Sequence, residues 1–217
     1  DMGAFSAAGH ALHTTNAATL QAIKDQTLEL GLPFSIHLAE HDDESTMLMG
    51  EKNALTELLQ EANIPLTNFR PPMTRPVSYA RALGLLDEAT LAVHCVTVND
   101  EDIRALHESG ATVCLCPRSN EFIGVGRAPW EKLVSAGIPC CLGTDGLGSN
   151  ADLNLWNEVR FIKERWQGEL SLDQAVAMLT RNPAAALGVI GLGELAPGKE
   201  ARFATVPKDV EELFSNG

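Results

Sequence analysis

Histidine and carboxylate side chains end four apolar, strand-like segments of this sequence: His10, His37 with Glu40, His94 and Asp145. Neutral imidazole and carboxylate groups bind divalent metal ions such as zinc, and water bound to such an ion loses a proton near neutral pH and becomes a nucleophile. A nearby carboxylate that is not a ligand can carry that proton to a leaving group. Glu40 suits this second role because it lies three residues after His37, beyond the strand end.

Each of these residues taken singly also has a structural interpretation. A lone histidine in a strand is more often a hydrogen-bonded core or surface residue than a ligand, and we apply that interpretation to His13, His41 and His107. Glu40 could simply begin a solvated acidic turn, because acidic residues occupy positions 42–44. The repetition of one chemistry at successive strand ends favours a functional site at those ends.

Strand-like segments alternate with helix-like segments, which predicts a parallel sheet with right-handed crossovers and an α/β fold. The carboxyl ends of such strands meet at one edge, where α/β enzymes place their chemistry. One amphipathic helix is expected at about 45–62, and a polar loop at 118–120. We expect five strands, at about 4–9, 33–38, 91–95, 112–116 and 139–144.

Composition narrows the range of partners. The 217 residues include 16 Lys and Arg against 29 Asp and Glu, a formal charge of -13. This charge repels phosphate backbones and anionic lipid, so we expect a small-molecule substrate and neither a nucleic acid nor a membrane partner. No apolar run approaches the roughly 18 residues of a membrane span, and no signal-peptide pattern opens the sequence. The expected location is the cytoplasm.

The cysteines are odd in number and lie in or beside apolar segments, without a second Cys or His pair at zinc-finger spacing. We predict that they are reduced core residues: Cys95, Cys114, Cys116, Cys140 and Cys141.

Several short motifs together resemble the amidohydrolase superfamily, specifically its metal-dependent deaminase and chlorohydrolase branch. The motifs are His-Leu-Ala-Glu at 37–40, Val-His-Cys-Val at 93–96, Cys-Pro-Arg-Ser-Asn at 116–120, Gly-Thr-Asp-Gly-Leu-Gly-Ser-Asn at 143–150, Thr-Arg-Asn-Pro-Ala at 180–184 and Pro-Gly-Lys at 197–199. The run after Asp145 is most similar to aminofutalosine and S-adenosylhomocysteine deaminases. The resemblance covers nearly the whole chain.

This resemblance implies a (β/α)8 TIM barrel that binds one divalent metal ion, zinc or alternatively iron. It implies that His37 and Asp145 are metal ligands, that Glu40 is the proton shuttle, and that His94 orients the hydrolytic water or polarises the substrate. His10 and Ser149 would then lie near the substrate. The implied organisation is barrel at 1–190, one or more strands of a small β-sandwich at 191–208 and an acidic helix or tail at 209–217.

The family's leading metal ligands form a His-x-His motif on the first barrel strand, and this sequence contains no such motif. The chain therefore resembles only the C-terminal portion of the family, and we expect the N-terminal half of the same protein as its partner. Five strands of an eight-stranded barrel leave two open edges, so the isolated chain is expected to be inactive.

The function expected of the longer protein is hydrolytic deamination of an aminated purine or nucleoside-type heterocycle, with metal-bound hydroxide as nucleophile and ammonia as product. Two alternatives stay open: a chlorohydrolase or cyclic amidohydrolase with the same site, and a non-catalytic binding protein derived from the barrel. The sequence does not decide the substrate, the leaving group or whether the protein forms a homo-oligomer.

Overall fold

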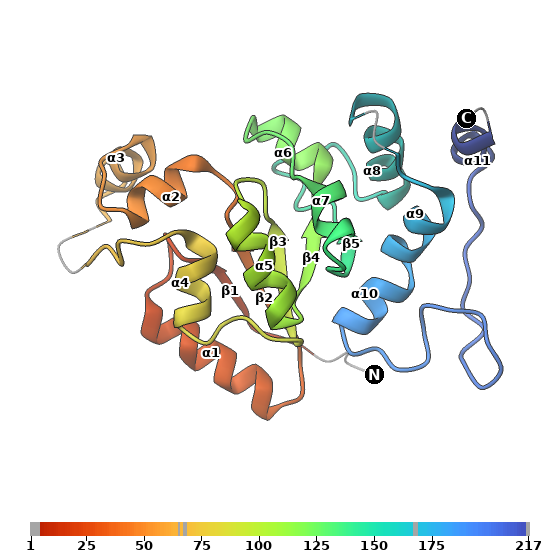
Figure 1. Ribbon diagram of the computed structural model, residues 1–217, viewed down its shortest axis with the longest axis horizontal. Helices are drawn as coiled ribbons and strands as arrows, with labels where there is room; N and C mark the ends of the chain where they lie inside the picture. Colours follow the sequence, from red (N-terminus) through yellow and green to blue (C-terminus); the bar gives the residue numbers. More distant parts are fainter. Residues whose placement is uncertain (1–4, 65, 67–68, 167–168, 216–217) are drawn as a thin grey trace.

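The computed structural model describes residues 5–64, 66, 69–166 and 169–215, and its centre is a parallel sheet (Figure 1). The described strands lie in sequence order and all neighbouring pairs are parallel, which confirms the predicted five-stranded arrangement. They are β1 (Ala8–Ala11), β2 (Phe34–Leu38), β3 (Thr90–His94), β4 (Thr112–Leu115) and β5 (Cys140–Leu142). The first strand lies later than the expected 4–9, so His10 lies within β1 rather than after it.

Helices connect the strands and continue beyond β5. In Figure 1, α1 to α4 lie to one side of the sheet and α8 to α11 to the other. No helix in the described part of the chain is both long and apolar enough to cross a membrane. The helices are α1 (Ala17–Glu29), α2 (Asp42–Leu48), α3 (Ala54–Glu61), α4 (Pro76–Ala82), α5 (Asp100–Ser109), α6 (Pro117–Ile123), α7 (Trp130–Ser135), α8 (Leu155–Phe161), α9 (Leu172–Leu179), α10 (Arg181–Ala186) and α11 (Lys208–Ser215), with a π-helical turn, η1 (Ile162–Trp166), after α8.

The prediction of a single helix at about 45–62 is wrong, because the segment forms α2 and α3 with a break between them. Gly50 adopts a left-handed backbone, at φ 83°, and ends the first helix. Asn53 then caps α3 by accepting a hydrogen bond from the Thr56 amide, and the Thr56 hydroxyl reciprocates at the Asn53 amide. The apolar periodicity runs through both helices, which is why it concealed the break.

The polar loop expected at 118–120 is also wrong, since these residues lie in α6. Pro117 occupies the first turn of this helix, where its missing N–H costs nothing and its fixed φ favours helical geometry. The helix ends at Gly124, with φ 83°.

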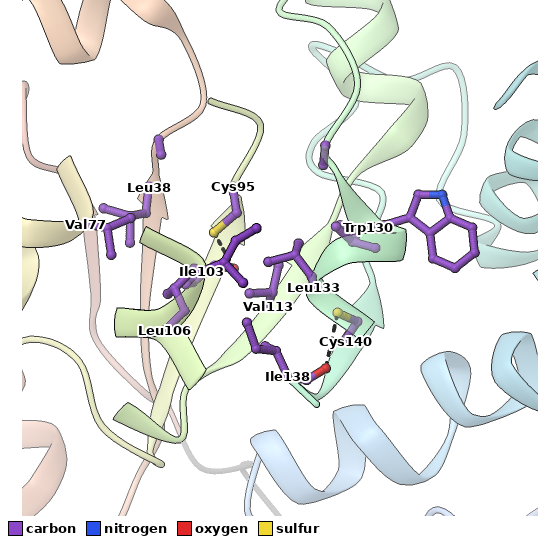
Figure 2. Packing of buried hydrophobic residues seen from close by; sticks show 14 of the residues in the cluster. Leu38, Val77, Cys95, Ile103, Leu106, Val113, Trp130, Leu133, Ile138 and Cys140 are labelled. Carbon is purple, nitrogen blue, oxygen red and sulfur yellow. Dashed lines mark hydrogen bonds between the residues drawn. The ribbon is translucent and has the colours of Figure 1, made fainter. Parts of the chain in front are cut away.

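The two faces of the sheet differ in their packing. On one face, alternate strand residues point toward the helices and form the main core. Ile36, Ala92 and Val113 are examples, in register across three neighbouring strands. Figure 2 shows Leu106 of α5 and Leu133 of α7 near Val113 of β4. The opposite face carries the remaining residues in register, and its buried cluster consists of Cys114, Cys116 and Cys141 with the partly buried Leu91 and Val93.

The strand expected within 191–208 is not formed: residues 191–207, all of which the structure describes, contain no strand. An isolated sandwich strand has no neighbour with which to pair its backbone. Over residues 209–215 the expected acidic helix or tail corresponds to α11, whose Asp209 accepts a hydrogen bond from Arg160 at 2.6 Å, and the last two residues of that expectation lie outside the described part of the chain. The division into 1–190, 191–208 and 209–217 as domains stays a prediction.

Candidate functional site

Three histidines meet at the carboxyl edge of the sheet. The Nδ1 atom of His37 lies 3.1 Å from the carbonyl oxygen of His10, to which it donates, so its Nε2 atom is the nitrogen available to a ligand. The ring centroids of His10 and His37 are 5.3 Å apart, and those of His37 and His94 are also 5.3 Å apart. Strand ends that are 27 and 57 residues apart in sequence therefore contribute to one site.

The backbone at the strand ends is left-handed at non-glycine residues. His37 is in register with Val93, so strict alternation would place His94 on the opposite face from His37. His94 has φ 75° and the following Cys95 has φ 49°, which redirects the His94 ring to the face of His37. Ala39, which follows β2, and Asp145, which follows β5, are also left-handed, with φ 51° and 55°. Such conformations cost about 1–3 kcal/mol each and cluster at functional sites.

His94 lies between an amide and a carboxylate. Its Nδ1 atom is 2.8 Å from the Oδ1 atom of Asn120, and its Nε2 atom is 3.5 Å from the Oε1 atom of Glu40. The ring is almost fully buried, at 1 % exposure. If Nδ1 donates its proton to Asn120, Nε2 is the nitrogen that faces Glu40 and reacting groups. The ring is thus fixed in orientation beside the predicted proton shuttle.

Asp145 follows β5 and accepts hydrogen bonds from two serines. The hydroxyls of Ser119, at 2.8 Å, and Ser149 both contact its Oδ2 atom. Partial burial raises the pKa of Asp145, but the bonds from Ser149 and Ser119 and from the Gly146 backbone outweigh it, so the pKa lies below its ordinary value. Asp145 is therefore ionised at neutral pH, the form that binds a cation.

The pKa of His37 is lowered, first by burial and then by the proximity of His94. Its imidazole is therefore held neutral, which is the form that ligates a metal. His37 and Asp145 thus fit a divalent ion chemically. In the part of the chain that the structure describes, however, no group of three or more Cys, His, Asp or Glu side chains is arranged to hold a metal. A catalytic zinc needs about three protein ligands, so these donors are an incomplete set.

A pocket of about 400 Å³ opens beside Glu40. Its polar side is formed by Glu40 with residues at the start of α2, and its apolar side by α3 with the last residue of α6 and the segment that follows. No Lys or Arg lines it among the described residues. The lining consists of His13, Glu40, His41, Asp43, Glu44, Ala54, Leu55, Leu58, Ile123 and Val125.

Glu158 of α8 connects two segments of the site, a role that sequence reasoning missed. It is completely buried, and its carboxylate accepts from the Arg118 amide at 2.9 Å and from the Asn150 side chain at 2.9 Å. Asn150 also donates to the Thr144 carbonyl, next to Asp145. Burial raises the pKa of Glu158. Nothing in the local pattern around Glu158 distinguishes it from a helix-surface acid.

The sequence interpretation also missed Ser119, Asn120 and Glu44, although the first two lie inside the Cys-Pro-Arg-Ser-Asn motif that supported the resemblance. His41 is structural, as expected: it accepts from the Asp43 amide and caps α2. Burial and neighbouring histidines lower the pKa of His13 to about 4. All five cysteines are free and buried, which confirms the prediction of reduced core thiols.

Comparisons with known proteins give the chain a family and several relatives. The family model described as "Amidohydrolase family" matches residues 3–217. The chain is 33 % identical over 212 residues to a 5-methylthioadenosine/S-adenosylhomocysteine deaminase of Haloarcula marismortui, covering 94 % of this chain and 44 % of that protein. It is 32 % identical over 166 residues to an aminodeoxyfutalosine deaminase of Deinococcus radiodurans, covering 73 % of this chain and 40 % of that protein. The chain thus spans less than half of these relatives.

A solved structure of an adenosine deaminase from Xanthomonas campestris with bound zinc superposes with a TM-score of 0.71 at 26 % identity, over 89 % of this chain and 41 % of that one. A triazine hydrolase variant superposes with a TM-score of 0.70 at 19 % identity, again over 89 % of this chain and 40 % of that one, and supports the fold alone. Together with the five parallel strands, these matches confirm the expected fold class, part of an amidohydrolase-type (β/α)8 barrel.

Proposed function

Because the chain belongs to the amidohydrolase family, we propose that it forms part of a metal-dependent hydrolase that deaminates an aminated purine or nucleoside-type substrate and releases ammonia. The observation that carries this proposal is the approach of Glu40 to His94, 3.5 Å from carboxylate to ring nitrogen, beside His37 at the carboxyl edge of the sheet. The names of the relatives, which include deaminases of adenosine-like compounds, supply the substrate class.

His37 and Asp145 are the residues of this chain that would hold a divalent ion, with zinc the first candidate because the similar adenosine deaminase contains it. When bound, such an ion supplies Lewis acidity that activates water for attack near neutral pH. The remaining ligands would come from protein outside these 217 residues. That segment would also pair with β1 and β5, the two edges of the described sheet.

Glu40 and His94 divide the proton transfers and the positioning between them. Glu40 takes a proton from the attacking water and delivers it to the nitrogen that leaves as ammonia, so the carboxylate is regenerated at the end of the cycle. His94, fixed by Asn120, presents Nε2 to the reacting atoms and orients the water or polarises the substrate. His94 ends β3 and Glu40 lies two residues beyond β2, so the sheet positions both groups and little reorganisation accompanies the reaction.

The substrate is a small molecule, because the net charge of -13 and the acidic pocket beside Glu40 disfavour polyanions. The five reduced thiols fit a cytoplasmic location. A chlorohydrolase with the same residues is the second candidate, favoured only by the fold likeness to the triazine hydrolase.

The test uses the longer protein that contains this chain, loaded with zinc. Adenosine, 5′-methylthioadenosine, S-adenosylhomocysteine, aminodeoxyfutalosine, 8-oxoguanine and atrazine are each incubated with it, and ammonia and chloride are measured. Ammonia released from one or more purine substrates supports the proposal. Chloride release from atrazine without any ammonia favours the chlorohydrolase, and no product from any compound favours a non-catalytic protein.

A further inference from the structure

Glu44 is a buried carboxyl that the proposed reaction does not use. It lies in the first turn of α2 and is only 1 % exposed. Its Oε2 atom accepts a hydrogen bond from the backbone amide of Glu40 at 3.1 Å, while its Oε1 atom has no hydrogen-bond partner among the described residues. A buried acid with an unpartnered oxygen is costly, so its position requires a physical reason.

That reason lies in the peptide unit between Ala39 and Glu40. The chain leaves the sheet here through the left-handed Ala39, and neither polar group of the peptide has a ladder partner in the short strand β2. The Ala39 carbonyl accepts from the Thr97 amide at 2.8 Å and from its hydroxyl at 3.2 Å. The Glu40 amide donates to Glu44 on the other side. The peptide is therefore hydrogen-bonded at both ends, which fixes the direction in which the Glu40 side chain leaves the backbone.

We propose that Glu44 is a positioning residue for Glu40: by accepting from the Glu40 amide, it holds the Glu40 carboxylate toward Nε2 of His94. This inference rests on the proposed function, in which Glu40 carries the proton. A displacement of the shuttle by about 1 Å can cost about 100-fold in rate, so an oriented backbone bond has a large effect on turnover.

The charge state of Glu44 agrees with this role. Burial raises the pKa of Glu44 to about 8 and outweighs the hydrogen bond from the Glu40 amide, which lowers it; the nearby Glu40 carboxylate raises it further. At neutral pH Glu44 is therefore uncharged. It keeps a carbonyl-type oxygen for the Glu40 amide without placing a second negative charge beside the shuttle. Glutamine has the same shape and the same kind of acceptor oxygen, so Glu44→Gln should still hold Glu40 in position.

The test compares Glu44→Gln with Glu44→Met, which removes the acceptor but keeps an unbranched side chain of similar length. In the longer, zinc-loaded protein, Glu44→Gln should keep kcat within about threefold, whereas Glu44→Met should lower kcat by about 10- to 100-fold with little change in KM. Glu57→Met, at an exposed position of α3, is the matched control and should leave kcat unchanged.

A second background separates positioning from a general structural effect. In Glu40→Gln protein the shuttle is already removed, so adding Glu44→Met should change kcat by less than about twofold. Full wild-type kcat in Glu44→Met, or the same fold loss in both backgrounds, would overturn the inference. Should Glu44→Met fail to fold, Thr97→Val removes one bond to the opposite end of the same peptide, and an unchanged kcat there overturns the inference. A wild-type protein that releases no ammonia would instead overturn the proposed function itself.

Discussion

Replacing Ser119 by alanine tests whether the hydrogen bonds around Asp145 prepare it for a metal ion. Ser119 is fully buried, and its hydroxyl contacts Asp145 Oδ2 at 2.8 Å and the Ser149 hydroxyl at 2.8 Å. Because each hydroxyl has a single proton, Oδ2 of Asp145 accepts from both serines only when neither serine donates to the other. The substitution removes one of these donors and leaves the other.

The expected magnitude follows from the surroundings of the carboxylate. A hydrogen bond to a charged group contributes about 1.5–3 kcal/mol, and the lower end applies because Asp145 is partly solvated. About 1.4 kcal/mol corresponds to a tenfold change, so Ser119→Ala should weaken zinc binding about tenfold. Loss of the bond also raises the pKa of Asp145 toward its ordinary value, so zinc should be released at a higher pH on acidification.

The assay is competition with a chromophoric chelator, using the longer protein that contains this chain. Ser109→Ala is the matched control, because the Ser109 hydroxyl is also hydrogen-bonded, to the Leu106 carbonyl at 2.8 Å, but lies at the end of α5. Zinc affinity of Ser119→Ala within twofold of wild type would refute the reasoning, as would an equal loss in the control.

Two further predictions concern stability. Since the pKa of Glu44 rises from 4.5 in the unfolded chain to about 8 when folded, its proton is bound more tightly in the native state. The contribution of Glu44 to the free energy of unfolding should therefore fall as pH rises from about 4.5 to about 8, by up to about 5 kcal/mol, while His13, whose pKa is lowered on folding, acts in the opposite direction below about pH 6.5. In urea titrations the difference in free energy between wild type and Glu44→Gln should show this fall, and a difference that does not change with pH would contradict the assignment. A Cβ at Gly143 would lie 2.7 Å from the Cys114 sulfur, so Gly143→Ala should lower the free energy of unfolding by about 1–3 kcal/mol and lower the melting temperature. Gly146 has open space around it, so Gly146→Ala should leave the melting temperature unchanged, and equal melting temperatures for the two variants would contradict the packing.

Much of the fold followed from local pattern. Five apolar segments separated by helical ones determine a parallel sheet with little ambiguity, and β2 to β5 formed within one or two residues of the bounds expected for them. The errors arose where one residue changes a pattern, as at Gly50 between α2 and α3. The absence of a strand at 191–207 has a different cause: a strand forms only with a neighbouring strand, which no local sequence encodes.

The site was less accessible to sequence reasoning than the strands. The residue types at the strand ends predicted a site there, and the roles of His37 and Asp145 as metal ligands stay predictions. Alternation alone would have placed His94 on the wrong face, and its left-handed backbone has no glycine or asparagine to signal it. The sequence placed Glu44 in a solvated acidic turn, whereas it is buried and accepts a hydrogen bond from the Glu40 amide. Burial of such a residue depends on long-range packing.

The most direct test of the account is the rate of ammonia release by Glu40→Gln in the longer, zinc-loaded protein, compared with wild type and with Glu51→Gln, an exposed acid between α2 and α3. If Glu40 carries the proton, Glu40→Gln should lose at least about 100-fold in kcat with its zinc content unchanged, and Glu51→Gln should keep full activity. A Glu40→Gln protein that deaminates its substrate at the wild-type rate would contradict the account.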